Sequence, residues 1–160
     1  MSLRSSFLAA AICLAASPMM AQMMPNPYGA PISLEDARRA GLAALDEARK
    51  NHWTMAVAVV DTSGNLVFYE KMDNTQLGSA EVAIDKARSA TLYKRPTKAM
   101  QDALAAGGVG LRILSLKGAE PVEGGIPLLA DGKIIGAIGV SGDAAEHDAQ
   151  CAKAGADTVK

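Results

Sequence analysis

Residues 124–142 read GGIPLLADGKIIGAIGVSG, with apolar segments on either side of Asp131 and Gly132. An Asp-Gly pair between apolar segments is typical of a two-residue hairpin turn, because both residues tolerate the positive φ that such a turn requires. The stretch therefore predicts an antiparallel hairpin. Its strands are expected over residues 126–129 and 134–140.

Two glycines, Gly136 and Gly139, interrupt the second predicted strand. Glycine inside a strand marks a bulge, or a place where a helix, a second backbone or a ligand comes close. Helix packing and a functional surface both agree with this pattern, so we keep the two interpretations open.

A helix is expected to begin near Ala144, directly after the hairpin. Asp143 can cap it, and Glu146 can reach back as in a capping box. The backbone N–H groups of Ser141 and Gly142 would then form a small anion-binding concavity at the helix N-terminus. The alternative is an ordinary capped helix without a ligand.

The rest of the chain alternates between helical and strand patterns. The order is helix, hairpin, two helices, two or three strands, helix, which predicts an α+β domain of profilin-like or PAS-like shape. Its antiparallel sheet of about five strands is flanked by helices. Beyond the hairpin of 124–142, we expect helices near 33–51, 79–93, 98–105 and 144–154, strands over 55–60 and 66–70, and a strand or an irregular segment over 112–116.

Composition restricts the classes of function. The chain has 160 residues, of which 49% are hydrophobic, and a net charge of −1. This length fits one domain with a sizeable core. Nucleic acids and anionic membrane surfaces require a basic face, which the near-neutral charge does not favour.

The N-terminus has the form of a secretory signal peptide over residues 1–21. Arg4 precedes an apolar run over residues 7–16, and Ala21 offers a cleavage site. The run is too short to span a bilayer. Cys13 follows Ile12 where a lipoprotein signal needs a small residue, so we expect no lipid anchor. The sequence predicts a periplasmic or secreted protein.

Residues 22–31, QMMPNPYGAP, contain three prolines and no hydrophobic period, which predicts a flexible arm before a single domain over residues 32–160. Cys151 is then the one cysteine of the mature chain, which excludes an internal disulfide. Stability must come from packing or assembly. Long strands with little charge favour a homo-oligomer that covers a sheet edge.

Four segments together resemble one protein family: VVDTSGNLV (59–67), KMDNT (71–75), AIDKARSAT (83–91) and the hairpin of 124–142. The chain resembles the GlcG/HbpS-like haem-binding and haem-degrading proteins over residues 32–155. The same domain forms the C-terminus of PduO-type corrinoid adenosyltransferases. The resemblance implies a profilin-like fold, homo-oligomers and haem binding, in some members with iron release.

Haem iron needs an axial ligand, most often histidine. The only histidines are His52 and His147. Cys151 follows His147 at i+4 on the same helix face, so the two can converge on a metal. His52 lies beside Trp53, whose ring can pack on a porphyrin. The alternatives are a solvated surface His147 and a helix-capping His52.

A site for haem or for a small carboxylate also needs cationic side chains, which pair with the propionates or with the carboxylate. Lys86 and Arg88 are the candidates, and a solvated helix face is the alternative. Ser141 lacks the nucleophile-elbow pattern, and the chain contains no HExxH, CxxC, phosphate-binding loop or dinucleotide motif.

We therefore expect an exported, homo-oligomeric haem-binding protein, with haem degradation in the presence of an oxidant as a further activity. One alternative is an accessory module that binds a small organic acid at Ser141 and Gly142 without haem. The other is an uncharacterised enzyme that uses the same pocket for proton transfer.

Overall fold

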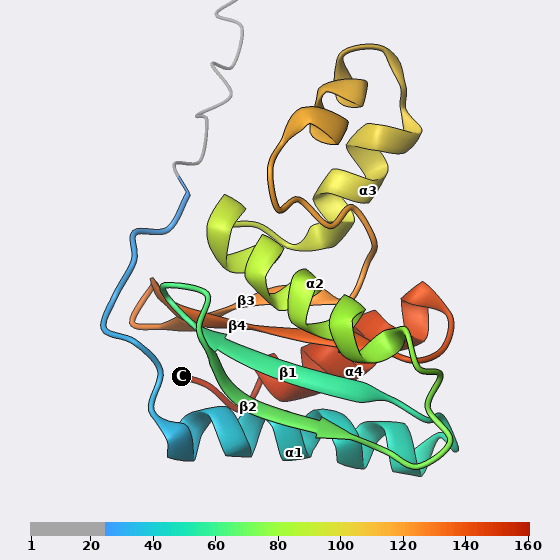
Figure 1. Ribbon diagram of the computed structural model, residues 1–160. Coiled ribbons are helices and arrows are strands. Elements are labelled where there is room, and N and C mark those ends of the chain that lie inside the picture. The colour runs from blue at the N-terminus through green and yellow to red at the C-terminus, as the bar shows by residue number, and fades with distance from the viewer. Residues whose placement is uncertain (1–24) are drawn as a thin grey trace, which may run out of the picture.

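The computed structural model describes residues 25–160, so the predicted signal peptide lies outside the described residues. Four strands form one antiparallel sheet in the order β2-β1-β4-β3 (Figure 1). No helix in the described range is long and apolar enough to cross a membrane. The elements are α1 (Leu34–Lys50), β1 (Ala56–Asp61), β2 (Leu66–Lys71), α2 (Ser79–Tyr93), α3 (Thr97–Ala105), the 3₁₀ helix η1 (Gly108–Ser115), β3 (Gly125–Ala130), β4 (Lys133–Ser141) and α4 (Ala145–Ala156).

Helices cover both faces of the sheet. In Figure 1, α1 and α4 lie below the sheet and α2 lies above it, while α3 and η1 project beyond α2. The predicted α+β architecture, an antiparallel sheet flanked by helices, is confirmed. The order of elements also agrees, apart from the segment before β3.

The core forms around β1, whose residues Ala56–Val60 are fully buried. Val57 and Val59 belong to the large apolar cluster that the sheet shares with α1 and α4. On the opposite face, β1 meets a row of alanines from α2. The continuous apolar run of this strand is therefore explained by burial on both faces.

The small side chains of α2 let the helix lie close to β4. A Cβ atom on Gly139 would lie 2.0 Å from the carbonyl oxygen of Ala83, and one on Gly136 would lie 2.2 Å from that of Val60. Helix packing is therefore the interpretation that the structure supports for Gly139, whereas Gly136 lies close to a second backbone, that of β1. The hairpin turn is as predicted, with φ of 49° at Asp131 and 70° at Gly132.

Two expectations about the elements differ from the structure. The sheet has four strands rather than about five, because residues 108–115 form η1. Gly107 and Gly108, both with positive φ, turn the chain back toward α3, where Ile113 becomes buried instead of pairing with a strand. The capping box is absent, since the N-cap of α4 is Ala144 and no side chain caps it.

The N-terminal arm is attached to the sheet over its described part. Tyr28 forms a parallel bridge with Ile134, and the Tyr28 hydroxyl donates a hydrogen bond of 2.8 Å to the Thr91 carbonyl oxygen. The Nζ atom of Lys94 lies 4.2 Å from the centre of the Tyr28 ring, which is cation–π geometry. The expected flexible arm therefore does not extend to Tyr28.

A buried ion pair joins the two helical layers. Lys86 on α2 and Asp148 on α4 are 1% and 3% exposed, and 2.7 Å separates the Lys86 Nζ and Asp148 Oδ2 atoms. Lys86 Nζ also donates to the Val140 carbonyl oxygen at 3.0 Å. Asp148 accepts the N–H groups of Asp143 and Gly142. One pair therefore connects α2, the end of β4 and the start of α4.

Breaking this pair should destabilise the fold strongly. We expect Lys86→Met to lower the free energy of unfolding by about 3–5 kcal/mol, because Asp148 would be left as a buried charge without its partner. Lys153→Met, which removes an exposed lysine that pairs with Asp157, should change it by less than about 1 kcal/mol. The measurement is urea denaturation, and equal effects of the two substitutions would contradict the role given to the pair.

The packing of α2 on β4 gives a second prediction. Gly139→Ala should cost about 1–3 kcal/mol of unfolding free energy, because the added methyl forces the backbone of α2 away from the strand. Gly78→Ala is the matched control, since no atom lies within 4 Å of the added Cβ and φ is −64°. It should stay within about 0.5 kcal/mol of the wild type. A Gly139→Ala protein as stable as this control would show that α2 and β4 are not tightly packed at Gly139.

Candidate functional site

His147, in the first turn of α4, is held in one orientation by two neighbours. Its ring stacks on Trp53 with 3.9 Å between ring centroids and an interplanar angle of 11°. Its Nδ1 atom lies 3.2 Å from Asp143 Oδ1. The side chain is 39% exposed, so the fixed imidazole still faces solvent.

Asp143 determines which nitrogen of His147 is available. The Ala144 N–H donates to Asp143 Oδ1 at 2.7 Å, and this bond, together with His147, lowers the pKa of the Asp143 carboxyl. The carboxylate is therefore ionised at neutral pH and accepts the Nδ1 proton of His147. In the neutral imidazole this tautomer leaves the lone pair on Nε2, as in the carboxylate–histidine arrangement of many metal sites.

His52 has a structural role in the backbone at the end of α1. The His52 N–H donates to the Arg49 carbonyl and the Trp53 N–H to the Ala48 carbonyl, which is the Schellman pattern. His52 adopts the left-handed conformation with φ of 61°, and its side chain is exposed. The helix-capping interpretation of His52 is thus supported.

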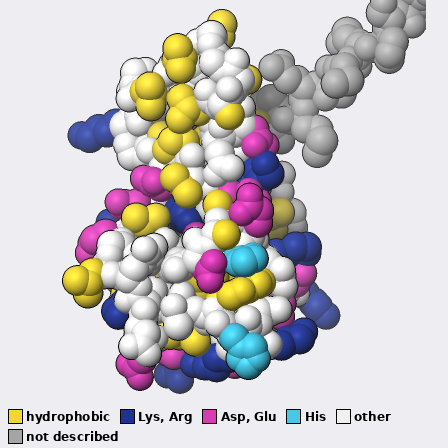
Figure 2. All heavy atoms as spheres, turned by 90° about the vertical axis from the view of Figure 1, so that its right-hand side faces the viewer, with side chains coloured by type: hydrophobic (Ala, Val, Ile, Leu, Met, Phe, Trp, Pro, Cys, Tyr) yellow, Lys and Arg dark blue, Asp and Glu magenta, His cyan; other side chains and the backbone are white. Residues whose placement is uncertain are grey.

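The two histidines lie on the same face of the molecule. Figure 2 shows both in cyan, with hydrophobic side chains between them. Trp53 explains this arrangement, because it follows His52 in the chain and stacks on His147. The sequence suggested that Trp53 acts together with its neighbour His52. In the structure, the Trp53 ring stacks on His147 instead.

Cys151 does not join His147 at a metal site. It is fully buried, and this burial, with negative charges nearby, raises the pKa of the Cys151 thiol to about 12. A neutral buried thiol is a poor metal ligand. Within residues 25–160, no group of three or more histidine, cysteine, aspartate or glutamate side chains could hold a metal ion.

The predicted anion-binding concavity is already filled. Asp148, from the same helix, accepts the N–H groups of Gly142 and Asp143. The Ser141 side chain is buried, and its hydroxyl lies 3.3 Å from that of Ser79. The proposed site at Ser141 and Gly142 is therefore corrected: the protein's own carboxylate takes the place of a ligand anion.

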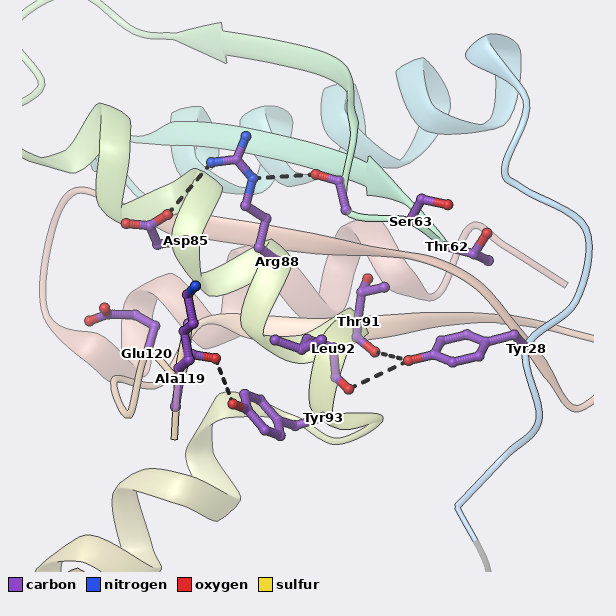
Figure 3. Close-up of a pocket in the computed structure, with 13 residues that line it drawn as sticks. Tyr28, Thr62, Ser63, Asp85, Arg88, Thr91, Leu92, Tyr93, Ala119 and Glu120 are labelled. Atoms are coloured by element: carbon purple, nitrogen blue, oxygen red, sulfur yellow. Dashed lines mark hydrogen bonds and ion pairs between the residues drawn. The ribbon is translucent and has the colours of Figure 1, made fainter. Parts of the chain in front are cut away.

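Lys86 and Arg88 have different surroundings. Lys86 is buried and its ammonium group is paired with Asp148, so it does not reach a ligand at the surface. Arg88 is half exposed and lines a pocket of about 750 Å³ beside the C-terminal half of α2 (Figure 3). The residues that line this pocket include neither histidine. The structure therefore does not bring Arg88 together with His52 or His147 in this pocket.

Sequence reasoning missed several residues of these two sites. Asp143 was read as a helix cap, although its i,i+4 spacing from His147 indicates a contact on one helix face. Tyr28, Tyr93 and the segment Lys117–Glu120 line the pocket through long-range contacts that no local pattern indicates.

Comparison with known proteins places the fold in a family. Residues 32–157 match the family described as haem degrading protein HbpS-like. The chain is 40% identical to protein GlcG of Escherichia coli over 99 residues, which is 62% of this chain and 72% of GlcG.

Two solved structures are also similar. A variant of HbpS from Streptomyces reticuli has a TM-score of 0.76 and 31% identity, covering 91% of this chain and 99% of that one. A complex of PduOC with haem has a TM-score of 0.73 and 26% identity, covering 81% of this chain and 96% of the other. The expected family is confirmed, and this chain belongs to the HbpS-like family.

Proposed function

We propose that this protein binds haem and that His147 supplies the axial ligand through Nε2. Family membership and the haem complex of the related PduOC support haem as the ligand. The observation that carries the choice of residue is the fixed imidazole of His147, held by Asp143 and Trp53 at the surface.

The residues on this face fit one side of a haem group. Imidazole is the commonest axial donor to haem iron, and an ionised carboxylate on Nδ1 increases the basicity of Nε2. The hydrophobic side chains between the two histidines in Figure 2 offer apolar surface for a porphyrin. Bound haem would supply the iron and any redox chemistry, whereas this chain orients the imidazole.

Each neighbour of His147 has a distinct task. Asp143 accepts the Nδ1 proton, so that in the neutral imidazole the lone pair lies on Nε2. Trp53 restricts rotation of the ring by stacking on it. His52 lies outside this arrangement in our proposal, because its backbone caps α1 and no ring of residues 25–160 stacks on its side chain.

Export, assembly and haem degradation complete the proposal. Arg4 and the apolar run over residues 7–16 support cleavage of a signal peptide and a periplasmic or secreted location. Exposed apolar side chains such as Val109 and Leu114 support a homo-oligomer, because assembly would cover them. The family's description supports degradation of bound haem, for which we expect an added oxidant to be required.

The test is a haem titration of the mature protein followed by absorbance. We expect a saturable Soret shift that His147→Ala abolishes and Asp143→Asn weakens by about tenfold, since partners of a metal-binding histidine affect affinity by such factors. His52→Asn is the matched control: it removes the second imidazole while asparagine tolerates the left-handed backbone.

Wild-type affinity in His52→Asn, together with loss in His147→Ala, would support the assignment. Loss of affinity in His52→Asn, together with wild-type affinity in His147→Ala, would assign the axial ligand to His52. A wild-type protein without a saturable Soret shift would exclude haem as its ligand.

A further inference from the structure

The pocket beside α2 is built from four segments that are distant in the sequence. Its residues come from the N-terminal arm, the β1–β2 turn, α2 and the segment before β3 (Figure 3). The lining comprises Tyr28, Thr62, Ser63, Gly64, Asp85, Arg88, Thr91, Leu92, Tyr93 and residues 117–120. Its volume of about 750 Å³ lies within the range of ordinary small-molecule sites.

Hydrogen bonds attach every wall of the pocket to α2. Tyr28 donates to the Thr91 carbonyl oxygen, and Arg88 Nε donates to the Gly64 carbonyl oxygen at 3.3 Å. The Tyr93 hydroxyl donates to the Lys117 carbonyl oxygen at 2.6 Å, and the Glu120 N–H donates to the Ser89 hydroxyl. The pocket is therefore preformed, which reduces the entropic cost of binding.

Arg88 is the anchor available to a ligand. Its guanidinium has five N–H donors, but the recorded hydrogen bond to Gly64 uses only Nε. The nearest carboxylate, Asp85, lies 3.8 Å from the terminal Nη1 atom, which is too long for a hydrogen bond. The terminal N–H groups can therefore form a bidentate pair with an incoming carboxylate.

Apolar and polar groups of the lining complement this anchor. Leu92 is 56% exposed and presents apolar surface beside the Tyr93 ring. Thr91, in contrast, is 2% exposed, and its hydroxyl oxygen has no hydrogen-bond partner within residues 25–160. A buried polar atom without a partner is rare in folded proteins and is often found at functional sites. Burial, together with the nearby carboxylate of Asp85, raises the pKa of the Glu120 carboxyl.

We propose that this pocket binds a small organic carboxylate, whose anionic group pairs with Arg88 and whose apolar body lies against Leu92 and Tyr93. This is a second site, separate from His147. It replaces the small-acid site predicted at Ser141 and Gly142, which Asp148 fills. The carboxylate site and the proposed haem ligand use different residues, because the pocket lining contains neither histidine.

The test uses benzoate as the probe and the uncharged benzamide as its matched comparison, followed by amide NMR shifts of the mature protein without haem. Benzoate should give saturable shifts at Gly64, Leu92 and Gly118, and benzamide should bind about tenfold more weakly, since a charge-assisted hydrogen bond is worth more than a neutral one.

Variants of Arg88 separate charge from geometry. Arg88→Met should remove the preference for benzoate over benzamide, and Arg88→Lys should restore part of it, because lysine keeps the charge but not the bidentate fork. Arg49→Met, on a half-exposed arginine of α1, is the control and should bind as the wild type does. The proposal is overturned by absence of saturable shifts, by equal affinity for the two probes, or by unchanged preference in Arg88→Met.

Discussion

The buried pair of Lys86 and Asp148 is the constraint on which both the fold and the candidate haem site depend. Asp148 pairs with α2 through Lys86 and also accepts the N–H groups of Gly142 and Asp143. These contacts fix the position at which α4 begins. Since His147 directly precedes Asp148, the same contacts place the imidazole against Trp53 at the surface. A structural ion pair therefore positions the proposed iron ligand.

Much of the fold could be predicted from local signals, because the Asp-Gly turn, the apolar run of β1 and the proline before α3 each act within a few residues. The segment over residues 108–115 could not, since its conformation depends on packing against α3. Lys86 and Arg88 illustrate a further limit. Two residues apart on a helix they face different directions, so they could not serve one ligand. Which of them is buried depends on the sheet beneath α2.

In the candidate sites, too, residue types could be predicted from the sequence but long-range contacts could not. Both histidines could be named from the sequence, but the contact between Trp53 and His147 joins residues far apart in the chain. The pocket beside α2 combines four such segments, and only Arg88 among its residues was a candidate beforehand. Family resemblance predicted the fold, which is confirmed, and the haem ligand, which we propose, whereas the geometry of individual side chains was needed to choose between ligand residues.

The most direct test of the account is pulsed EPR of the ferric haem complex, prepared with ¹⁵N-labelled histidine. The account predicts hyperfine coupling from one histidine nitrogen to the iron, present in the wild type and in His52→Asn. Such coupling would show that an imidazole other than His52 binds the metal, which leaves His147 in a chain with two histidines. A saturated complex without histidine coupling, or coupling lost in His52→Asn, would contradict the claim that α4 presents the iron ligand.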